Sequence, residues 1–222
     1  MSDTAVLSQL PETIPRLRGR LHQVAFFVSI PAAVVLVIVA PTLATKLAAA
    51  VFGVGVALMF GASAGYHRIA WRPVNKLRMR RLDHSMIYVA IAGTYTPVVL
   101  VVLDGLWEAL ALAGVWAFVV AGVFVKLFGI DRLRVLGSAM YIVLGWSAVV
   151  GLPQILRELS VPEIALMFAG GLLYTGGAIV LATRRPDPDP QVFGYHEVWH
   201  AFTVAGWACH YVMVLLVLLS LR

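Results

Sequence analysis

The sequence predicts an all-α integral membrane protein with seven transmembrane helices, its N-terminus in the cytoplasm and its C-terminus outside. Three observations lead to this fold class. Hydrophobic residues make up 61% of the 222 residues and charged residues only 13%, with a mean hydropathy of +0.90; soluble domains contain about a quarter charged residues. Apolar stretches long enough to cross about 30 Å of hydrocarbon recur along the chain. Lysine and arginine are dense in alternate connections.

Seven stretches are predicted to span the membrane, each near the length of about 20 residues that a spanning helix needs. They lie near residues 22–44, 47–67, 84–103, 107–128, 134–152, 162–182 and 197–219. Because the connections are short, we expect one seven-helix domain over residues 22–222, preceded by a cytoplasmic N-terminal tail over residues 1–21. The first apolar stretch is too long for a signal-peptide core, so no cleaved signal is expected.

Basic residues set the predicted orientation. Fourteen of the 17 lysines and arginines fall in the tail and in the second, fourth and sixth connections; the others are Lys46, Arg157 and Arg222. Cytoplasmic loops carry an excess of Lys and Arg, so the tail and the even-numbered connections are placed in the cytoplasm. The expected location is the cell inner (cytoplasmic) membrane, as a multi-pass protein.

The net charge of +6 is explained by this topology, so no nucleic-acid partner is expected. Membrane lipid is the expected partner, and nothing in the sequence identifies a protein partner or an oligomeric state. The second connection, Arg68 to Leu82, interleaves basic and apolar residues. We expect it either to lie on the membrane surface against anionic headgroups or to be a cytoplasmic loop without a specific ligand.

Polar residues of three predicted spans meet at the cytoplasmic interface. His196 and His200 share a helix face because they are four residues apart, so both imidazoles can bind one metal ion, zinc being the usual one. A zinc site needs at least a third protein ligand. The predicted topology brings His67 and Asp83 to the same level, and Ser63 lies one turn, about 6 Å, deeper than His67. Ionisable residues inside a membrane are functional candidates by default.

These residues predict a zinc site in which His67, His196 and His200 are ligands and water takes the open position. Asp83 is either the base that takes a proton from this water, a fourth ligand, or the N-cap of the third helix. Ser63 either hydrogen-bonds a ligand, the water or a substrate carbonyl, or hydrogen-bonds its own helix.

Residues 196–200 also spell His-Glu-x-x-His, the signature of zinc proteases in which the glutamate is the base. No acidic residue follows this stretch, and Gly206 stands where metzincins have their third histidine. A third ligand must therefore come from upstream. We expect Glu197 to lie at the interface and to face Arg184 or Arg185.

The other histidines are not expected to bind the same ion. His210 lies ten residues past His200, about 15 Å further along the helix, where a satisfied histidine within the bundle is expected. His84 points about 100° away from the neighbouring Asp83, and His22 stands at the interface of the first span without an assigned partner. A haem site would use opposed single histidines, and a retinal protein would need a lysine in the last span, which this span lacks.

Four blocks of the sequence resemble motifs of the haemolysin III family. They are Ser63-Ala-Gly-Tyr-His67, Leu82-Asp83-His84-Ser85-Met86-Ile87-Tyr88, Ala90-Ile-Ala-Gly-Thr-Tyr-Thr-Pro97 and Tyr195-His196-Glu-Val-Trp-His200-Ala-Phe. This family is the bacterial branch of the progestin and adipoQ receptor superfamily and is more distantly similar to alkaline ceramidases. The resemblance implies seven helices and a cytoplasm-facing zinc site. The matching positions are Ser63, His67, Asp83, His196 and His200.

Two functional hypotheses follow. The first is a zinc-dependent hydrolase of lipid amides or esters with its site near the cytoplasmic interface, because an activated water at acyl-chain depth suits a bond just below the headgroup. The second is a non-catalytic receptor, or a membrane-homeostasis or cytolytic factor, with structural zinc; the superfamily is described with all of these roles. A pore is disfavoured, because no span shows a polar stripe suited to a water-filled channel.

Overall fold

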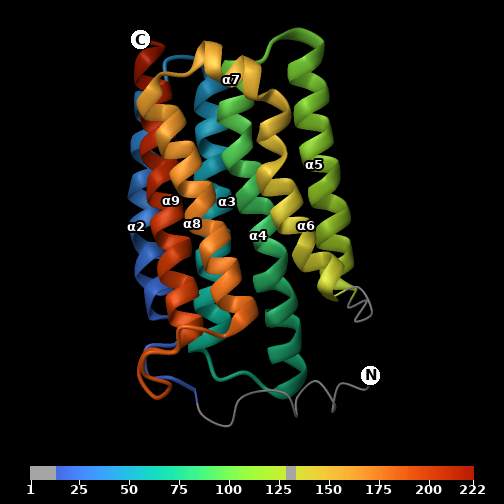
Figure 1. The fold of residues 1–222 in the computed structure, drawn as a ribbon, viewed down its shortest axis with the longest axis vertical. Coiled ribbons are helices and arrows are strands. Elements are labelled where there is room, and N and C mark those ends of the chain that lie inside the picture. Colours follow the sequence, from blue (N-terminus) through green and yellow to red (C-terminus); the bar gives the residue numbers. More distant parts are fainter. Residues whose placement is uncertain (1–13, 129–133) are drawn as a thin grey trace.

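The computed structural model describes residues 14–128 and 134–222 as a bundle of long helices that run side by side (Figure 1). The elements are α2 (Arg20–Val39), α3 (Leu43–Arg68), α4 (Pro73–Val102), α5 (Gly105–Leu127), α6 (Arg134–Trp146), the 3-10 turn η2 (Ser147–Gly151), α7 (Leu152–Glu158), α8 (Val161–Thr183) and α9 (Tyr195–Ser220). Within the described ranges, seven helical segments are long and apolar enough to cross a membrane. The predicted seven-helix fold class is confirmed, and the orientation of the termini stays a prediction.

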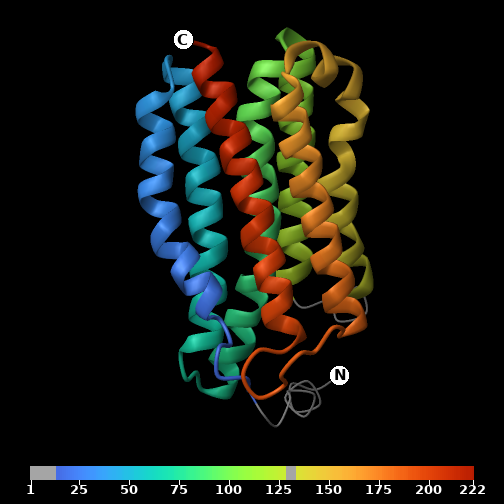
Figure 2. The same cartoon turned by 60° about the vertical axis from the view of Figure 1, so that its left-hand side comes forward.

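The bundle has two packed halves that share α4. In one half, α3 packs against α2 and α4, while α9 packs against α8 and α2. Side chains of α2, α3 and α9 meet in a core cluster that includes Leu36, Phe52, Phe60, Met213 and Val214. In the other half, a smaller cluster around Tyr88 joins α4 to α5 and α6. The start of α2 and the C-terminus lie at opposite ends of the bundle (Figures 1 and 2).

The outward faces of the helices are apolar. Phe27 of α2, Val54 of α3 and Trp107 of α5 are 63%, 58% and 71% exposed. Soluble monomers rarely leave large contiguous apolar surface in water, so faces of this kind suit contact with lipid. A multi-pass membrane protein follows from the structure; which membrane holds it remains the prediction made from the basic residues.

The first predicted span is too long at its end. Helix α2 stops at Val39, and α3 begins after Thr42. Pro41 has no backbone N–H to continue the first helix. The Thr42 hydroxyl accepts the backbone N–H of Thr45 at 3.2 Å, and the Thr45 hydroxyl accepts that of Thr42 at 3.1 Å, which caps the new helix.

The helix that contains the third predicted span begins about three turns before that span. Helix α4 begins at Pro73, a favoured first helical residue, and not near residue 84. Its 30 residues extend about 45 Å, so its first turns project beyond about 30 Å of hydrocarbon. The basic residues in these turns are good helix formers. Most of the segment predicted as a surface-lying stretch or loop is therefore the start of α4, and Arg72, not Asp83, is the N-cap.

The fifth span is interrupted where a single helix over residues 134–152 was expected. The spanning segment Ala139–Glu158 consists of parts of α6 and α7 joined by η2. The Tyr95 hydroxyl of α4 donates to Leu144 O at 2.9 Å and accepts the Ala148 N–H at 2.7 Å. Backbone groups that leave the α-helical pattern at membrane depth need such partners, so Tyr95 stabilises the break.

Candidate metal centre

The last turn of α3 carries His67, and its conformation is fixed by the chain that follows. The Trp71 indole N–H donates to Gly65 O at 2.9 Å, a carbonyl that also accepts the backbone N–H of Ile69 at 3.2 Å. The described N-terminal segment, residues 14–19, also reaches this turn. Gly19 has a φ of 76°, and a Cβ at this position would lie 2.6 Å from the His67 Cβ. The close approach therefore requires glycine.

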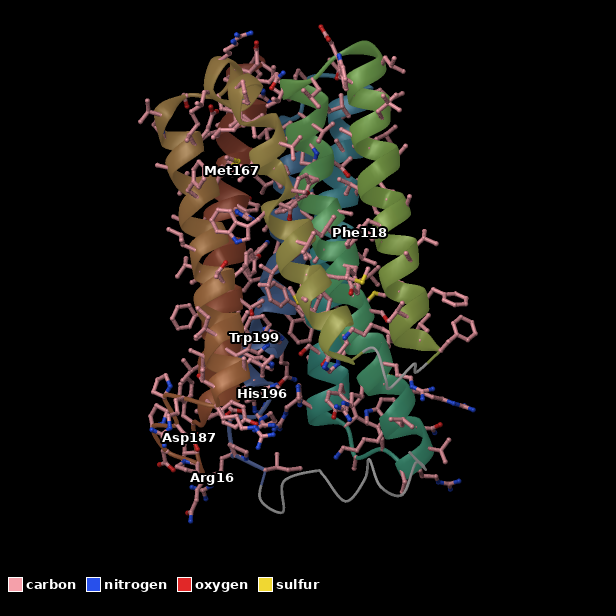
Figure 3. All side chains as sticks on the ribbon, turned by 45° about the vertical axis from the view of Figure 1, so that its right-hand side comes forward. Arg16, Phe118, Met167, Asp187, His196 and Trp199 are labelled. Carbon is pink, nitrogen blue, oxygen red and sulfur yellow. The ribbon has the colours of Figure 1, made fainter. Side chains whose placement is uncertain are left out.

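The first two turns of α9 carry His196 and His200. The Glu197 carboxylate accepts the Gly194 N–H at 2.9 Å, and the Asp187 carboxylate accepts the Tyr195 N–H at 2.8 Å. These bonds satisfy N–H groups that a helix start leaves free, so the start of the helix that bears both histidines is well defined. Figure 3 shows His196 at the end of the bundle where Arg16 and Asp187 also lie.

The structure brings the three predicted histidine ligands together. Each of His67, His196 and His200 has a ring nitrogen within 4.8 Å of the corresponding nitrogens of the other two, so these residues could hold a metal ion. The Nε2 atoms of His67 and His196 are 3.1 Å apart. Two imidazole nitrogens bound tetrahedrally to one zinc ion stand about 3.3 Å apart, given Zn–N distances of about 2.0–2.1 Å. A hydrogen bond would join only two rings, so the convergence of a third favours an ion.

Asp83 lies beside this group, in the third turn of α4. Its Oδ2 atom is 4.0 Å from His67 Nε2, and its side chain is 14% exposed. The side chain of Ser63, a residue that is 2% exposed, lies beside the Asp83 carboxylate, where its hydroxyl is placed to donate to it. The predicted N-cap role of Asp83 is wrong because the residue lies inside the helix. Its roles as base or as fourth ligand both stay open on this geometry.

Glu197 has a different partner from the one predicted. Its carboxylate pairs with the Arg18 guanidinium rather than with Arg184 or Arg185. The side chains of Glu197 and Arg18 are 1% and 13% exposed. Arg18 reaches this position because the described N-terminal segment pairs with the connection before α9, where the Arg16 and Leu17 N–H groups donate to Gln191 O and Val192 O. Glu197 therefore holds the helix start and the N-terminal segment together.

Sequence reasoning missed two residues at the site. Arg18 was counted only as a topological charge, and His22 had no assigned partner. In the structure, the His22 ring stacks on the His200 ring with centroids 3.7 Å apart and an interplanar angle of 11°. His22 is 3% exposed. The only signal in the sequence was an imidazole within the first apolar stretch, a place where ionisable residues are uncommon.

Two further histidines stand apart from the group. His210 Nε2 donates to Met167 O at 3.1 Å, between α8 and α9, so this histidine lies within the bundle as expected, but its Nδ1 has no hydrogen-bond partner among the described residues and it is only half satisfied. His84 Nδ1 lies 2.7 Å from Arg80 O, one turn earlier in its own helix. The His84 side chain is 37% exposed, and its Nδ1 is 4.0 Å from Asp83 Oδ2, but His84 is not among the three histidines whose nitrogens converge.

The fold and the site define a class of protein: a seven-helix membrane protein in which three histidines and a carboxylate gather at one end of the bundle. The sequence model of a family described as haemolysin-III related matches residues 12–211. The chain therefore belongs to the haemolysin III family, as the four motifs indicated.

Individual relatives match over most of the chain. It is 32% identical over 197 residues to the hemolysin-3 homolog of Bacillus subtilis (strain 168), which covers 87% of this chain and 89% of that protein. It is 34% identical over 197 residues to hemolysin-3 of Bacillus cereus, which covers 87% of both chains. A match of 24% over 178 residues to the human monocyte to macrophage differentiation factor covers 75% of this chain and 68% of that one.

Proposed function

We propose that the protein is a zinc-dependent hydrolase of lipid amides or esters, with its site near the cytoplasmic interface of the inner membrane. The observation that carries this proposal is the convergence of His67, His196 and His200 beside the Asp83 carboxylate. Three imidazoles without a thiol are a ligand set typical of catalytic zinc, whereas structural zinc sites use four closed ligands, usually with cysteine. The single cysteine, Cys209, is not part of the group.

Each residue has a chemical role in this proposal. Zinc bound by the three histidines supplies an activated water as nucleophile and polarises the substrate carbonyl. Asp83 accepts the proton that the nucleophile loses, because its carboxylate stands beside the histidine nitrogens without belonging to their group. In this proposal the Ser63 hydroxyl, which lies beside that carboxylate, donates to one of its oxygens and so orients it toward the reacting atoms.

A lipid substrate is supported by the surroundings of the site. The histidines lie on helices whose outer faces are apolar, so a substrate reaches them most easily from the bilayer. A cleft at the level of His210, about 15 Å along α9 from His200, is lined mainly by apolar side chains of α4, α6, η2, α7, α8 and α9, among them Val98, Trp146, Leu152, Met167 and Phe168. An acyl chain suits such a lining, and the bond to be cleaved would lie at the headgroup level.

The test is the purified protein in detergent, assayed for bound zinc and for cleavage of a long-chain N-acyl amide and its ester analogue. The wild type should cleave at least one of the two. Asp83→Asn should keep most of the zinc and lose turnover by about 100-fold or more, the usual contribution of a positioned base. Asp104→Asn, at the opposite end of the bundle, is the matched control and should behave as wild type.

The other outcomes are decisive as well. Loss of zinc in Asp83→Asn would make the carboxylate a fourth ligand and remove its role as base. A zinc-loaded wild type that cleaves neither lipid would contradict the hydrolase and leave the structural-zinc alternative.

A second candidate function comes from the relatives, because two Bacillus proteins similar to this chain carry the name hemolysin-3. We infer lysis of target membranes as this candidate. Dye release from liposomes would measure it, with Asp83→Asn as the comparison. Lysis that is equal in the wild type and in this variant would separate it from hydrolysis, whereas intact liposomes with the wild type would contradict it.

A further inference from the structure

His22 is packed into the histidine cluster from the side of α2. Its ring is parallel to that of His200, with centroids 3.7 Å apart, and it also contacts the Phe60 ring at 5.0 Å and an interplanar angle of 60°. The residue is 3% exposed. Helix α2 starts only two residues earlier, and Arg18 and Gly19 anchor the preceding turn against Glu197 and His67. The position of the His22 ring is therefore well determined.

Stacking alone does not account for a histidine at this position. Among residues 14–128 and 134–222, neither ring nitrogen of His22 has a hydrogen-bond partner. A buried polar group left unpaired costs about 1–3 kcal/mol. Phenylalanine would offer the same flat surface to His200 without burying two polar atoms. The imidazole therefore indicates a hydrogen-bonding role toward a group that enters the site.

The neighbouring ring shows a similar need. His200 Nδ1 is also buried without a hydrogen-bond partner in the described part of the chain. A histidine that binds a metal usually donates its other ring N–H to a hydrogen-bond acceptor. Two parallel rings that each bear an unpartnered nitrogen thus lie against one another, in contact with the cluster that His67 and His196 complete.

His22 is poorly placed to be a fourth metal ligand. The group of residues whose nitrogens converge within 4.8 Å does not include it. The lone pair of an imidazole lies in the ring plane, and Zn–N distances are about 2.0–2.1 Å. Two parallel rings 3.7 Å apart do not both direct a lone pair at one ion at that distance. A role toward a bound molecule remains.

We propose that His22 is a binding residue of this site and hydrogen-bonds the amide or hydroxyl group of the lipid bound there; the identity of the ligand rests on the hydrolase proposed above. A neutral imidazole carries one donor and one acceptor, and a hydroxyl or secondary amide carries the same pair. His22 therefore selects lipids with such a group close to the cleaved bond, rather than simple diacyl esters, which have no donor there.

Butanohydroxamate tests this without turnover, because hydroxamates bind zinc and carry an N–H and an O–H group. The affinity of butanohydroxamate for the zinc-loaded protein is measured for the wild type and for His22→Phe. The phenyl ring keeps the stacking, so bound zinc should stay near the wild-type value and Tm should not fall. Affinity should drop about tenfold, the worth of one good hydrogen bond.

His210→Phe is the matched control: its buried imidazole also has an unpartnered Nδ1, but it lies about 15 Å along α9 from His200, beyond the reach of this short probe. It should bind the probe as wild type does. His22→Gln, which keeps a donor and an acceptor, should bind the probe more tightly than His22→Phe and nearly as well as the wild type, so its comparison with the wild type tests the proposal even if the phenylalanine variant does not fold.

The outcomes separate the alternatives. Wild-type affinity in His22→Phe would overturn the proposal and leave His22 as a stacking partner only. Loss of zinc in this variant would also overturn it, because His22 would then belong to the metal-binding set. Tenfold weaker binding together with a wild type that cleaves no lipid would support the role of His22 and contradict the hydrolase.

Discussion

Glu197→Gln removes the charge of a carboxylate that is 1% exposed and paired with Arg18, but leaves an oxygen that can accept the Gly194 N–H. Neutralising one partner of a buried ion pair costs about 3–5 kcal/mol. Water can partly solvate the Arg18 side chain, which is 13% exposed, so we expect the lower end of this range. In a chain of this length about 1 kcal/mol corresponds to about 2–4 °C, and Tm should fall by about 6–12 °C.

Companion variants divide this loss into its parts. Glu197→Ala also removes the acceptor at the helix start and should lose about 1 kcal/mol more. Arg18→Gln combined with Glu197→Gln removes both charges, leaves no unpaired ion and should recover part of the Tm. Glu158→Gln is the control, because this exposed residue at the end of α7 should change Tm little.

The assay follows tryptophan fluorescence in detergent during heating, together with bound zinc and lipid-amide turnover at a temperature where all variants are folded. Glu197→Gln should retain turnover within a few-fold of the wild type. An unchanged Tm with turnover abolished would refute the reasoning. Glu197 would then be the base, as in His-Glu-x-x-His proteases, and the role given to Asp83 would be wrong.

Three further predictions concern the metal, the N-terminal segment and the orientation. The purified protein should carry about one zinc ion per chain. Alanine at any of the three clustered histidines should remove most of this zinc and lower Tm, because a metal that binds only the folded state stabilises it. The control variant His210→Ala should keep the zinc. Gly19→Ala places a Cβ 2.6 Å from the Cβ of His67 and forces an L-residue to a φ of 76°, so zinc retention and Tm should both fall. The control variant Gly114→Ala, whose added Cβ would have no atom within 4 Å, should change neither. A reporter that works only outside the cytoplasm should be active after Arg222 and silent after Arg185, and the reverse pattern would contradict the orientation.

The sequence alone was sufficient to predict the seven spans and the three histidines that lie together. The spans can be located from the hydropathy of successive residues alone, because each spanning helix forms its backbone hydrogen bonds within itself and presents apolar side chains to lipid. The alternating basic connections assigned spans to opposite ends, which placed His67 and Asp83 at the level of His196. His200 followed from the four-residue spacing on one helix.

Helix boundaries near the interface were less predictable. The apolar window marks where hydrocarbon begins, whereas a helix begins where its first turn can be capped. In α4 these points are about three turns apart, because the basic residues after Pro73 form a good helix outside the apolar layer. The sequence therefore placed Asp83 at the correct end of the bundle but in the wrong part of its helix.

The contacts of the N-terminal segment were decided only by the tertiary structure. Arg18 and Glu197 are 179 residues apart in sequence, and the pairing of His22 with His200 is of similar range. No periodicity links positions on the first and last helices, and a positive charge before the first span is already explained by topology. Only the packing of α2 against α9 aligns these turns, since it sets which side chains of two separately predicted helices face each other.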